Sequence, residues 1–231
     1  YDHIGGIPHL IPQLGYPPMY GLPLTNAIIK KRQEDFKGLK PLNIHDIKID
    51  DKLRLGSFEV EFFHLNHNIP DSMGVAIHTP EGTIVHTGDW KFDYQPVAGD
   101  QPADLQRIAQ IGSRGVLALL SDSTNASQPG HQISESEIGT NLEDIISDAP
   151  GRLIIGTFAS LLSRIKQIID IAEKTGKVVA LDGYSMKSNV EIAKELGYMK
   201  FNPRTLIDLK QVKEYPSNAT TLPVFSAISI I

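Results

Sequence analysis

The chain opens with Tyr1-Asp2-His3-Ile4-Gly5-Gly6, the stretch that bears most directly on its fold and function. The carboxylate of Asp2 and the imidazole of His3 are adjacent. Adjacent side chains diverge on a helix and face opposite sides of a strand, so both reach one metal ion only from an irregular turn. Gly5 and Gly6 let the backbone pass close to such an ion and enter a helix. A metal-binding turn explains the six residues, and so does an N-terminal turn with an incidental Asp-His pair.

The composition limits the class of protein. The chain has 231 residues, enough for one large domain or two modest ones, and its net charge of −5 argues against a generally basic nucleic-acid binder. It has no cysteine, so any zinc must be held by His, Asp and Glu, and a reducing cytoplasm is the expected compartment. No apolar run approaches the ~20 residues of a membrane helix, and no signal peptide is visible.

Polar residues follow several predicted strands. Strand-like alternation begins near Lys52, and the strands expected at 58–65, 84–87 and 116–120 each end in a polar loop, centred on His67, Asp89 and Asp122. Loops at the ends of sheet strands are where α/β folds gather functional groups. For His67 and Asp89 the spacing favours a functional role over a buried histidine or a loop cap. For Asp122 an Asx-turn explains the residue equally well.

The character changes after Pro129-Gly130. Ser134 and Glu137 predict a capped helix that ends near Pro150, and strands are expected at 152–156 and 177–181 with helices after each. This order predicts a parallel doubly wound unit, and hence two domains at 1–130 and 131–231. The turn 156–160 leads into a helix N-terminus that could receive a phosphate, with Ser160 and Arg164 as candidates. Ser160 as a plain N-cap is the favoured alternative. Shorter helices are expected at 7–14 and after a Thr25 cap.

Five motifs stand out along the chain: Asp-His-Ile-Gly-Gly at 2–6, Asn-His-Asn-Ile-Pro-Asp-Ser at 66–72, His-Thr-Gly-Asp-Trp-Lys-Phe-Asp at 86–93, Ser-Asp-Ser-Thr-Asn-Ala at 121–126 and Thr-Phe-Ala-Ser at 157–160. In this order and with these gaps they resemble the ribonuclease J family, in the β-CASP branch of nucleases with the metallo-β-lactamase fold. The resemblance implies an α/β fold: a partial αββα metallo-β-lactamase sandwich and a partial, inserted parallel α/β β-CASP domain.

The resemblance also implies a two-zinc centre, with manganese as a possible substitute. Asp2 and His3 look like ligands of one ion, His67 like a ligand of the other, and Asp89 like the carboxylate that bridges both. Asp122 matches the acidic first motif of the β-CASP region, which supports the metal-site histidines, so Asp2, Asp89 and Asp122 are the expected catalytic residues. The family cleaves RNA from the 5′ end and internally, prefers a 5′-monophosphate single strand and acts in RNA processing. A homo-oligomer is expected for the full-length protein.

The chain departs from the family pattern at both ends. The leading His-x-His would lie before Tyr1, and the later motifs would lie beyond Ile231, so we expect a fragment or a frame-shifted product that is itself inactive. Residues 220–231 do not resemble the family's continuation. Two alternatives remain: another hydrolase of the metallo-β-lactamase fold, acting on a small ester or DNA, or a non-catalytic remnant that binds RNA or a partner. Measuring bound metal separates the catalytic from the non-catalytic interpretation.

Overall fold

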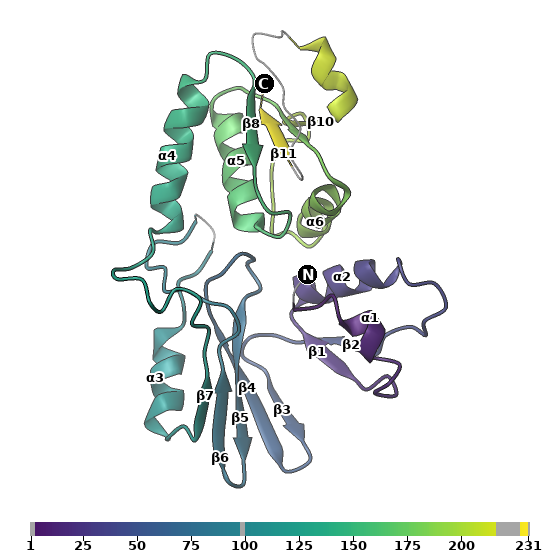
Figure 1. Ribbon diagram of the computed structural model, residues 1–231, viewed down its shortest axis with the longest axis vertical. Helices are drawn as coiled ribbons and strands as arrows, with labels where there is room; N and C mark the ends of the chain where they lie inside the picture. Colours follow the sequence, from purple (N-terminus) through teal and green to yellow (C-terminus); the bar gives the residue numbers. More distant parts are fainter. Residues whose placement is uncertain (1–2, 98–99, 216–226, 231) are drawn as a thin grey trace. The chain divides into compact units, whose positions relative to one another are not determined.

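The structure is a computed structural model that describes residues 3–97, 100–215 and 227–230 (Figure 1). The chain forms two compact units. Unit 1 contains residues 1–67, 71–92 and 102–130, and unit 2 contains residues 68–70, 93–101 and 131–231. No helix among the described residues is both long enough and apolar enough to span a membrane.

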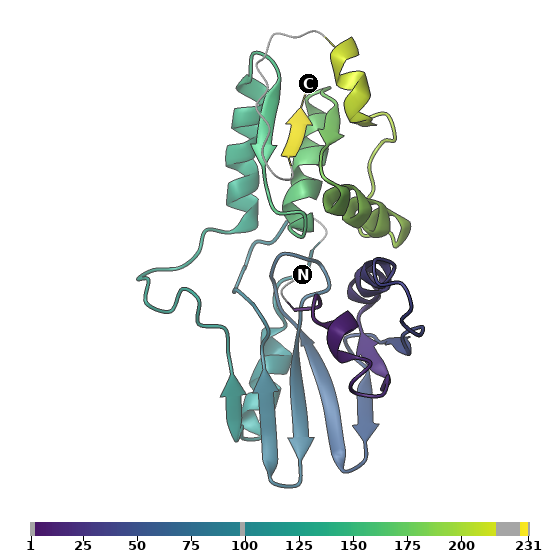
Figure 2. The same ribbon diagram turned by 45° about the vertical axis from the view of Figure 1, so that its right-hand side comes forward.

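Unit 1 is built on a five-stranded sheet, whose strands lie side by side in Figure 2. Its strands are β3 (Lys52–Leu55), β4 (Phe58–His64), β5 (Met73–Thr79), β6 (Gly82–His86) and β7 (Ala118–Leu120), in that order across the sheet. Pairing is antiparallel as far as β6, and β7 runs parallel to β6. Because a parallel neighbour needs a crossover connection, helix α3 (Leu105–Ser113) lies between β6 and β7 in the chain.

Alternation along the strands gives the sheet two apolar faces. Phe63, Ala76 and Val85 form one cluster with Ile111 of α3. Val60 and Phe62, one position out of phase, join a second cluster with residues of the N-terminal segment, Leu22 and Ile47. The sheet is therefore covered on both faces, as the sandwich prediction requires.

The N-terminal segment contains α1 (Ile7–Leu10), β1 (Met19–Gly21), α2 (Pro23–Gln33) and β2 (Ile44–Asp46), with β1 and β2 paired in parallel. The predicted helix at 7–14 is too long, because Pro12 has no N–H with which to continue the helical ladder. The Thr25 cap is also wrong. Helix α2 begins at Pro23, and the backbone N–H groups of Leu24 and Thr25 donate to Asp71 Oδ2 at 2.7 and 3.3 Å.

Unit 2 alternates helices and strands, as predicted. Its elements are α4 (Glu135–Asp148), β8 (Leu153–Gly156), α5 (Leu162–Lys174), β9 (Val179–Leu181), α6 (Tyr184–Glu195), β10 (Leu206–Ile207), a 3₁₀ helix (Leu209–Glu214) and β11 (Ala227–Ile230). The Ser134 cap is confirmed, because its side chain accepts from the N–H of Glu137. Helix α5, one of the helices predicted after these strands, turns an apolar face inward, since Ile165, Ile168 and Ala172 are fully buried.

The sheet of unit 2 is mixed, which corrects the prediction of a purely parallel one. Its order is β10-β9-β11-β8, and β11 pairs antiparallel with both β8 and β9. Strands β8 and β9 thus run in the same direction, as expected, but do not pair with each other. The alternating Ala-Ile-Ser-Ile of 227–230 supplies a strand whose two edges satisfy the backbone groups of both neighbours.

Strand β7 leaves an apolar edge. No described strand pairs with its outer side, and Leu117 and Leu119 are 65% and 63% exposed. Uncharged apolar edge strands promote association between chains. We expect Leu119→Lys to reduce concentration-dependent association in sedimentation velocity runs, because a lysine on the edge opposes strand pairing. Leu14→Lys is the matched control, since Leu14 is 67% exposed but lies outside the sheet. Equal effects of both variants would show that general apolar exposure, not the edge, drives association.

Candidate metal centre

Two predicted ligands meet in unit 1. His3 Nε2 lies 2.9 Å from Asp89 Oδ2, although 86 positions separate the residues. His3 comes from the turn before α1, and Asp89 from the bend after β6. Both side chains are partly open to solvent, at 58% and 39% exposure. An imidazole and a carboxylate from two distant segments of the sequence therefore meet at a site that is open to solvent.

The turn that carries Asp89 is fixed by its own backbone. Gly88 has φ of +63°, a left-handed conformation that favours glycine. The buried Thr87 donates its hydroxyl to Gly88 O at 2.7 Å and accepts from the N–H of Asp122 at 3.2 Å. The N–H of Gly88 donates to His86 Nδ1 at 2.9 Å. Thr87 thus joins the Asp89 turn to the loop that carries Asp122.

The loop that carries His67 is tied on both sides. The N–H of Lys91 donates to Asn66 O at 2.9 Å, which links this loop to the Asp89 turn. On the far side, the buried carboxylate of Asp71 caps α2. His67 lies in the bend between these two ties. The backbone of the His67 loop is therefore positioned by its neighbours on both sides.

Asp122 is held in an Asx-turn, and the charge of His67 acts on it. Its Oδ1 accepts from the hydroxyl and the N–H of Thr124, at 2.6 and 2.8 Å. These two bonds lower the pKa of Asp122, and the N–H of Trp90 and the charge of His67 lower it further. The lowered pKa keeps this carboxylate ionised at neutral pH. The Asx-turn that was one of the two interpretations of Asp122 is therefore present, and the charge of the predicted ligand His67 also acts on this carboxylate.

The described residues bring His3 into contact with Asp89, whereas Asp122 is linked to His67 only through the effect of the His67 charge on its pKa. Asp2 lies outside them. Within residues 3–97, 100–215 and 227–230, no group of three or more His, Cys, Asp or Glu side chains is arranged to hold a metal. The chemistry of the donors nevertheless fits a divalent ion, because imidazole and carboxylate are ligands of both zinc and manganese. The contact between His3 and Asp89 is the part of the predicted centre that the structure describes.

The two phosphate-site candidates lie in unit 2 and are placed differently from each other. Arg164 is engaged, because its Nη2 and Nε donate to Glu135 Oε2 at 2.8 and 3.3 Å. The alternative role of Ser160 as a plain N-cap is wrong: the N-cap of α5 is Leu161, with no side-chain cap bond. Ser160 instead forms part of the turn that precedes the helix, where its carbonyl accepts from the N–H of Leu162.

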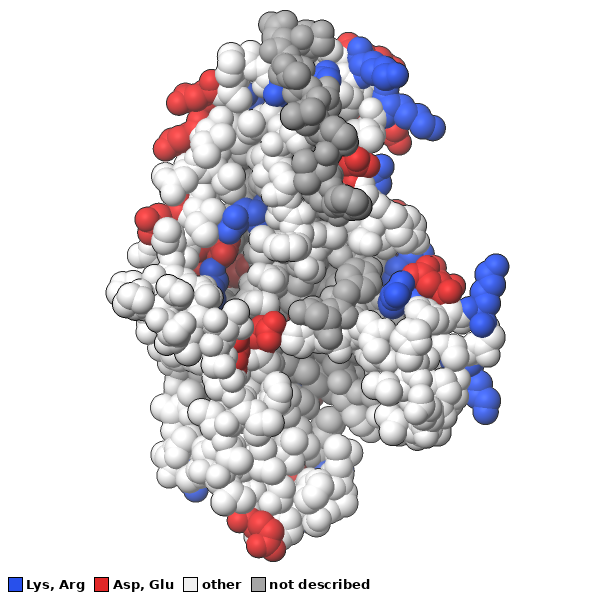
Figure 3. All heavy atoms as spheres, in the orientation of Figure 1, with Lys and Arg blue, Asp and Glu red and all other residues white. Residues whose placement is uncertain are grey.

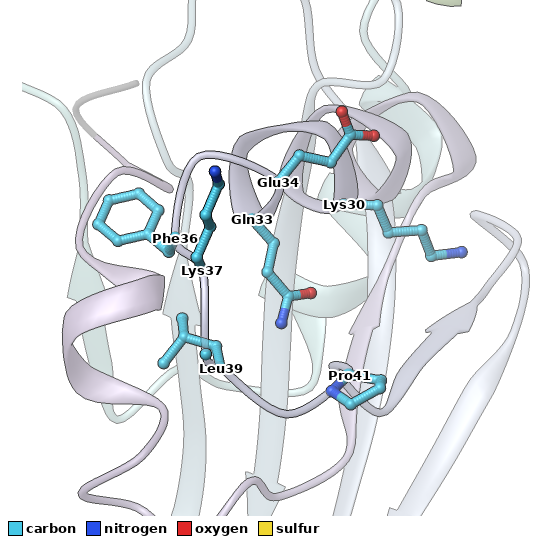
Figure 4. A pocket seen from close by; sticks show the side chains of 8 residues that line it. Lys30, Gln33, Glu34, Phe36, Lys37, Leu39 and Pro41 are labelled. Carbon is cyan, nitrogen blue, oxygen red and sulfur yellow. The ribbon is translucent and has the colours of Figure 1, made fainter.

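An open hollow of about 390 Å³ lies beside the end of α2, away from the predicted ligands (Figure 4). It is lined by Lys30, Gln33, Glu34, Phe36, Lys37, Gly38, Leu39 and Pro41. Gln33 closes part of it by donating to Lys40 O at 2.6 Å. None of the predicted site residues lines this hollow.

Sequence reasoning missed two residues that position the site, Asp71 and Thr87. Asp71 stands inside a recognised motif, but nothing in its neighbourhood indicates that it caps a helix 47 positions earlier. Thr87 precedes the Gly-Asp turn and has a side chain of the type that bonds to nearby backbone. Its polar character at the end of a buried strand was the available signal.

Both halves of the chain match known protein families. Residues 1–114 match the β-lactamase superfamily domain, and residues 150–225 match the β-CASP domain of ribonuclease J. Ribonuclease J of Thermus thermophilus is 44% identical over 94% of this chain and 39% of its own length. Ribonuclease J 1 of Streptococcus pyogenes is 42% identical over 92% and 37%, and ribonuclease J2 of Bacillus subtilis is 37% identical over 96% and 40%.

A crystal structure of a protein of unknown function from Enterococcus faecalis V583 has a TM-score of 0.61, with 16% identity over 87% of this chain and 51% of that one. This likeness concerns the fold alone. The chain spans well under half the length of the curated relatives that it matches. Over that span, two domain matches in the right order and identities of 37 to 44% agree with the five motifs, and the chain belongs to the ribonuclease J family.

Proposed function

We propose that the chain is part of a metal-dependent ribonuclease that hydrolyses RNA phosphodiester bonds from the 5′ end and internally, in RNA processing and decay. The observation that carries the proposal is the contact of His3 with Asp89 at 2.9 Å, between two family motifs 86 positions apart. The fold of unit 1 supports it, because the β-lactamase superfamily match implies use of a divalent metal. The ribonuclease names of the relatives indicate an RNA substrate.

The proposed ligands divide between two ions. Asp2 and His3 would hold one, His67 the other, and Asp89 would bridge them, with zinc as the expected metal and manganese as the alternative. When bound, the pair of ions supplies a hydroxide at neutral pH and stabilises the charge of the attacking and leaving oxygens. In this proposal Asp2 and Asp89 touch the metals, and Asp122 acts through His67.

The side chains of this site then have separable tasks. Thr87 and Gly88 hold the Asp89 carboxylate in the turn where it meets His3. In this proposal the ionised Asp122, on which the charge of His67 acts, would favour one orientation of that imidazole and strengthen it as a metal ligand. Ser160 and Arg164 stay proposals for phosphate binding, and use of Arg164 would require it to leave Glu135.

We further propose that residues 1–130 form the metallo-β-lactamase-like domain and 131–231 the β-CASP-like domain. A preference for 5′-monophosphate ends, assembly of the longer protein into a homo-oligomer and a cytoplasmic location complete the proposal. The alternative hydrolase on a small ester or DNA is disfavoured by the β-CASP match at 150–225. RNA or partner binding without hydrolysis is the second candidate. It is favoured by the observation that the described residues contain no group of three metal-ligating side chains.

The 231-residue chain tests the proposal directly. We expect weak binding of zinc and manganese in titration calorimetry and little cleavage of a 5′-monophosphorylated single-stranded RNA, because the two ions would share four protein ligands and the ion on His67 would have only His67 and Asp89, short of the three of a usual catalytic site. Metal removal by a chelator should abolish any residual cleavage. The matched comparison is Asp89→Ala, which should weaken metal binding further. Strong Asp89-dependent cleavage by this chain alone would contradict the expected inactivity. Metal binding that Asp89→Ala leaves unchanged would contradict the site.

A further inference from the structure

Unit 2 exposes two aromatic side chains at one edge of its sheet. Phe158 follows β8 and is 78% exposed, the largest value among the large apolar side chains of the described residues. Tyr184 follows β9 and is 70% exposed. Strands β8 and β9 are both antiparallel to β11, so their carboxyl ends lie at the same edge of the sheet. Two exposed aromatic side chains thus follow strands that end at the same edge of this sheet.

The backbone around both rings is tightly held. The carbonyl of Phe158 accepts from the N–H of Leu161 at 3.0 Å, which closes the turn before α5. The side-chain amide of Asn189, itself buried, donates to Ala159 O at 2.9 Å and so fastens α6 to this turn. Gly183, with φ of +98°, places Tyr184 at the first position of α6. The rings therefore stand on a rigid frame that costs little entropy to use in binding.

The charge beside the rings is suited to a phosphate chain. Lys187 is exposed, lies three residues after Tyr184 on α6, and hence shares its helical face. Among the described residues it forms no ion pair. On the face seen in Figure 3, basic and acidic side chains are interspersed rather than gathered into one basic field. A nucleic acid would therefore need contacts other than charge, and exposed rings supply them.

We propose that Phe158 and Tyr184 are stacking positions for the bases of single-stranded RNA, with Lys187 serving the phosphate backbone beside them. This rests on the proposed ribonuclease function and adds a site for substrate bases on unit 2. Stacking on aromatic rings tolerates any base, because every base has a π-face. The site would therefore raise affinity for unpaired RNA without selecting a sequence.

The test measures RNA binding separately from cleavage. A fluorescent, 5′-phosphorylated oligouridylate is titrated with the 231-residue chain in a chelator, and anisotropy gives the affinity. Phe158→Ala and Tyr184→Ala should each weaken binding by about 5- to 150-fold, the equivalent of one lost stacking contact. Phe158→Trp should retain affinity, and its indole fluorescence should be quenched by the RNA. Phe58→Ala, which removes a 44% exposed ring at the start of β4 in unit 1, is the matched control and should leave affinity unchanged.

A second probe, the same phosphodiester chain with abasic sugars, isolates the role of the bases. Wild-type and Phe158→Ala chains should bind it equally, and Lys187→Ala should weaken the binding of both probes. Unchanged oligouridylate binding in both aromatic variants would overturn the proposal, and so would an equal loss on the abasic probe. A wild-type chain that binds neither probe also overturns it. If the variants change only the sedimentation coefficient, the rings serve contact between copies of this chain, which again overturns it. Failure of the ribonuclease function would appear elsewhere, as absence of Asp89-dependent cleavage by a longer ribonuclease J that contains this chain when metal is supplied.

Discussion

Replacing Asp89 by alanine in a longer ribonuclease J that contains this chain is expected to lower metal-dependent RNA hydrolysis by about 10³-fold or more. The physical reason is that one carboxylate is proposed to serve both ions. Two-metal clamps contribute several kcal/mol to the stabilisation of transition-state charge, and ~4 kcal/mol corresponds to about 10³-fold in rate. The measurement is the initial rate on a 5′-monophosphorylated RNA with saturating zinc or manganese, together with the metal content of the purified protein.

Two variants control this experiment. Asp89→Asn keeps the shape of the side chain and removes its charge, so it should lose most activity while the protein stays folded. Glu81→Ala removes an exposed carboxylate from the turn between β5 and β6, at the other end of the strand that leads to Asp89. It should leave the rate unchanged. If Asp89→Ala keeps both its two ions and most of its activity, Asp89 is not the bridging ligand.

The sequence predicts the strands of unit 1 well, because their alternation reports directly on burial. Apolar residues recur along both faces of these strands, and Phe63 of β4 and Val85 of β6 prove to be core residues of one face. Because strands end where the alternation ends, the positions of the His67 and Asp89 loops also follow from local pattern. Their tertiary approach does not, and only the ordered motifs of the resemblance suggested that His3 would approach Asp89.

What the sequence could not predict depends on partners far along the chain. The N-terminus of α2 is capped by Asp71, whose carboxylate accepts from the N–H of Leu24. Nothing in the sequence near α2 indicates that a carboxylate from another loop accepts this hydrogen bond. The place of β11 between β8 and β9 likewise depends on which strand edges remain free after the helices pack. Asp122 shows a third case: its side chain forms the local Asx-turn and is also affected by the charge of His67, so the two sequence interpretations are not exclusive.

The second large effect is expected at Glu61, a carboxylate buried in the sheet of unit 1 at 2% exposure. Its Oε1 accepts from His78 Nε2 at 2.6 Å and lies 2.9 Å from Arg114 Nη2. Its Oε2 is 3.7 Å from Arg107 Nη2 and 3.8 Å from Lys52 Nζ. Two arginines, a lysine and a histidine thus surround one carboxylate. The negative charge of Glu61 offsets the repulsion between these positive side chains.

The pKa of Glu61 reports the balance of these effects. Burial by itself raises the pKa, but the hydrogen bond from His78 and the charges of Arg114, Lys52 and His78 outweigh burial, and the pKa is lowered from its ordinary 4.5. A carboxyl whose pKa is lower in the folded state stabilises the fold above its unfolded pKa. That stabilisation is complete at neutral pH, begins to decline near the ordinary pKa of 4.5, and is gone only when the pH has fallen through the lower pKa of the folded state.

We therefore expect Glu61→Gln to lower the free energy of unfolding of unit 1 by about 3 kcal/mol at pH 7. Removing one partner of a buried ion pair typically costs ~3–5 kcal/mol, and the low end applies because Arg114 and Lys52 are about half exposed and can turn to water. Urea denaturation followed by circular dichroism gives the difference. Glu59→Gln is the matched control, two residues earlier on the same strand face. Glu59 is 50% exposed and pairs with Lys52, so its loss should cost under ~1 kcal/mol.

The pH dependence separates the ionic role of Glu61 from simple packing. If charge carries the effect, the stability gap between wild type and Glu61→Gln narrows as the pH falls below about 4.5, because the wild-type carboxyl then becomes neutral as well. If the gap instead persists unchanged to low pH, the cost arises from the shape and hydrogen bonds of the amide in this pocket. A gap no larger than that of Glu59→Gln at pH 7 would mean that the surrounding cations are hydrated well enough without Glu61, and that the buried cluster adds little to the stability of the sheet.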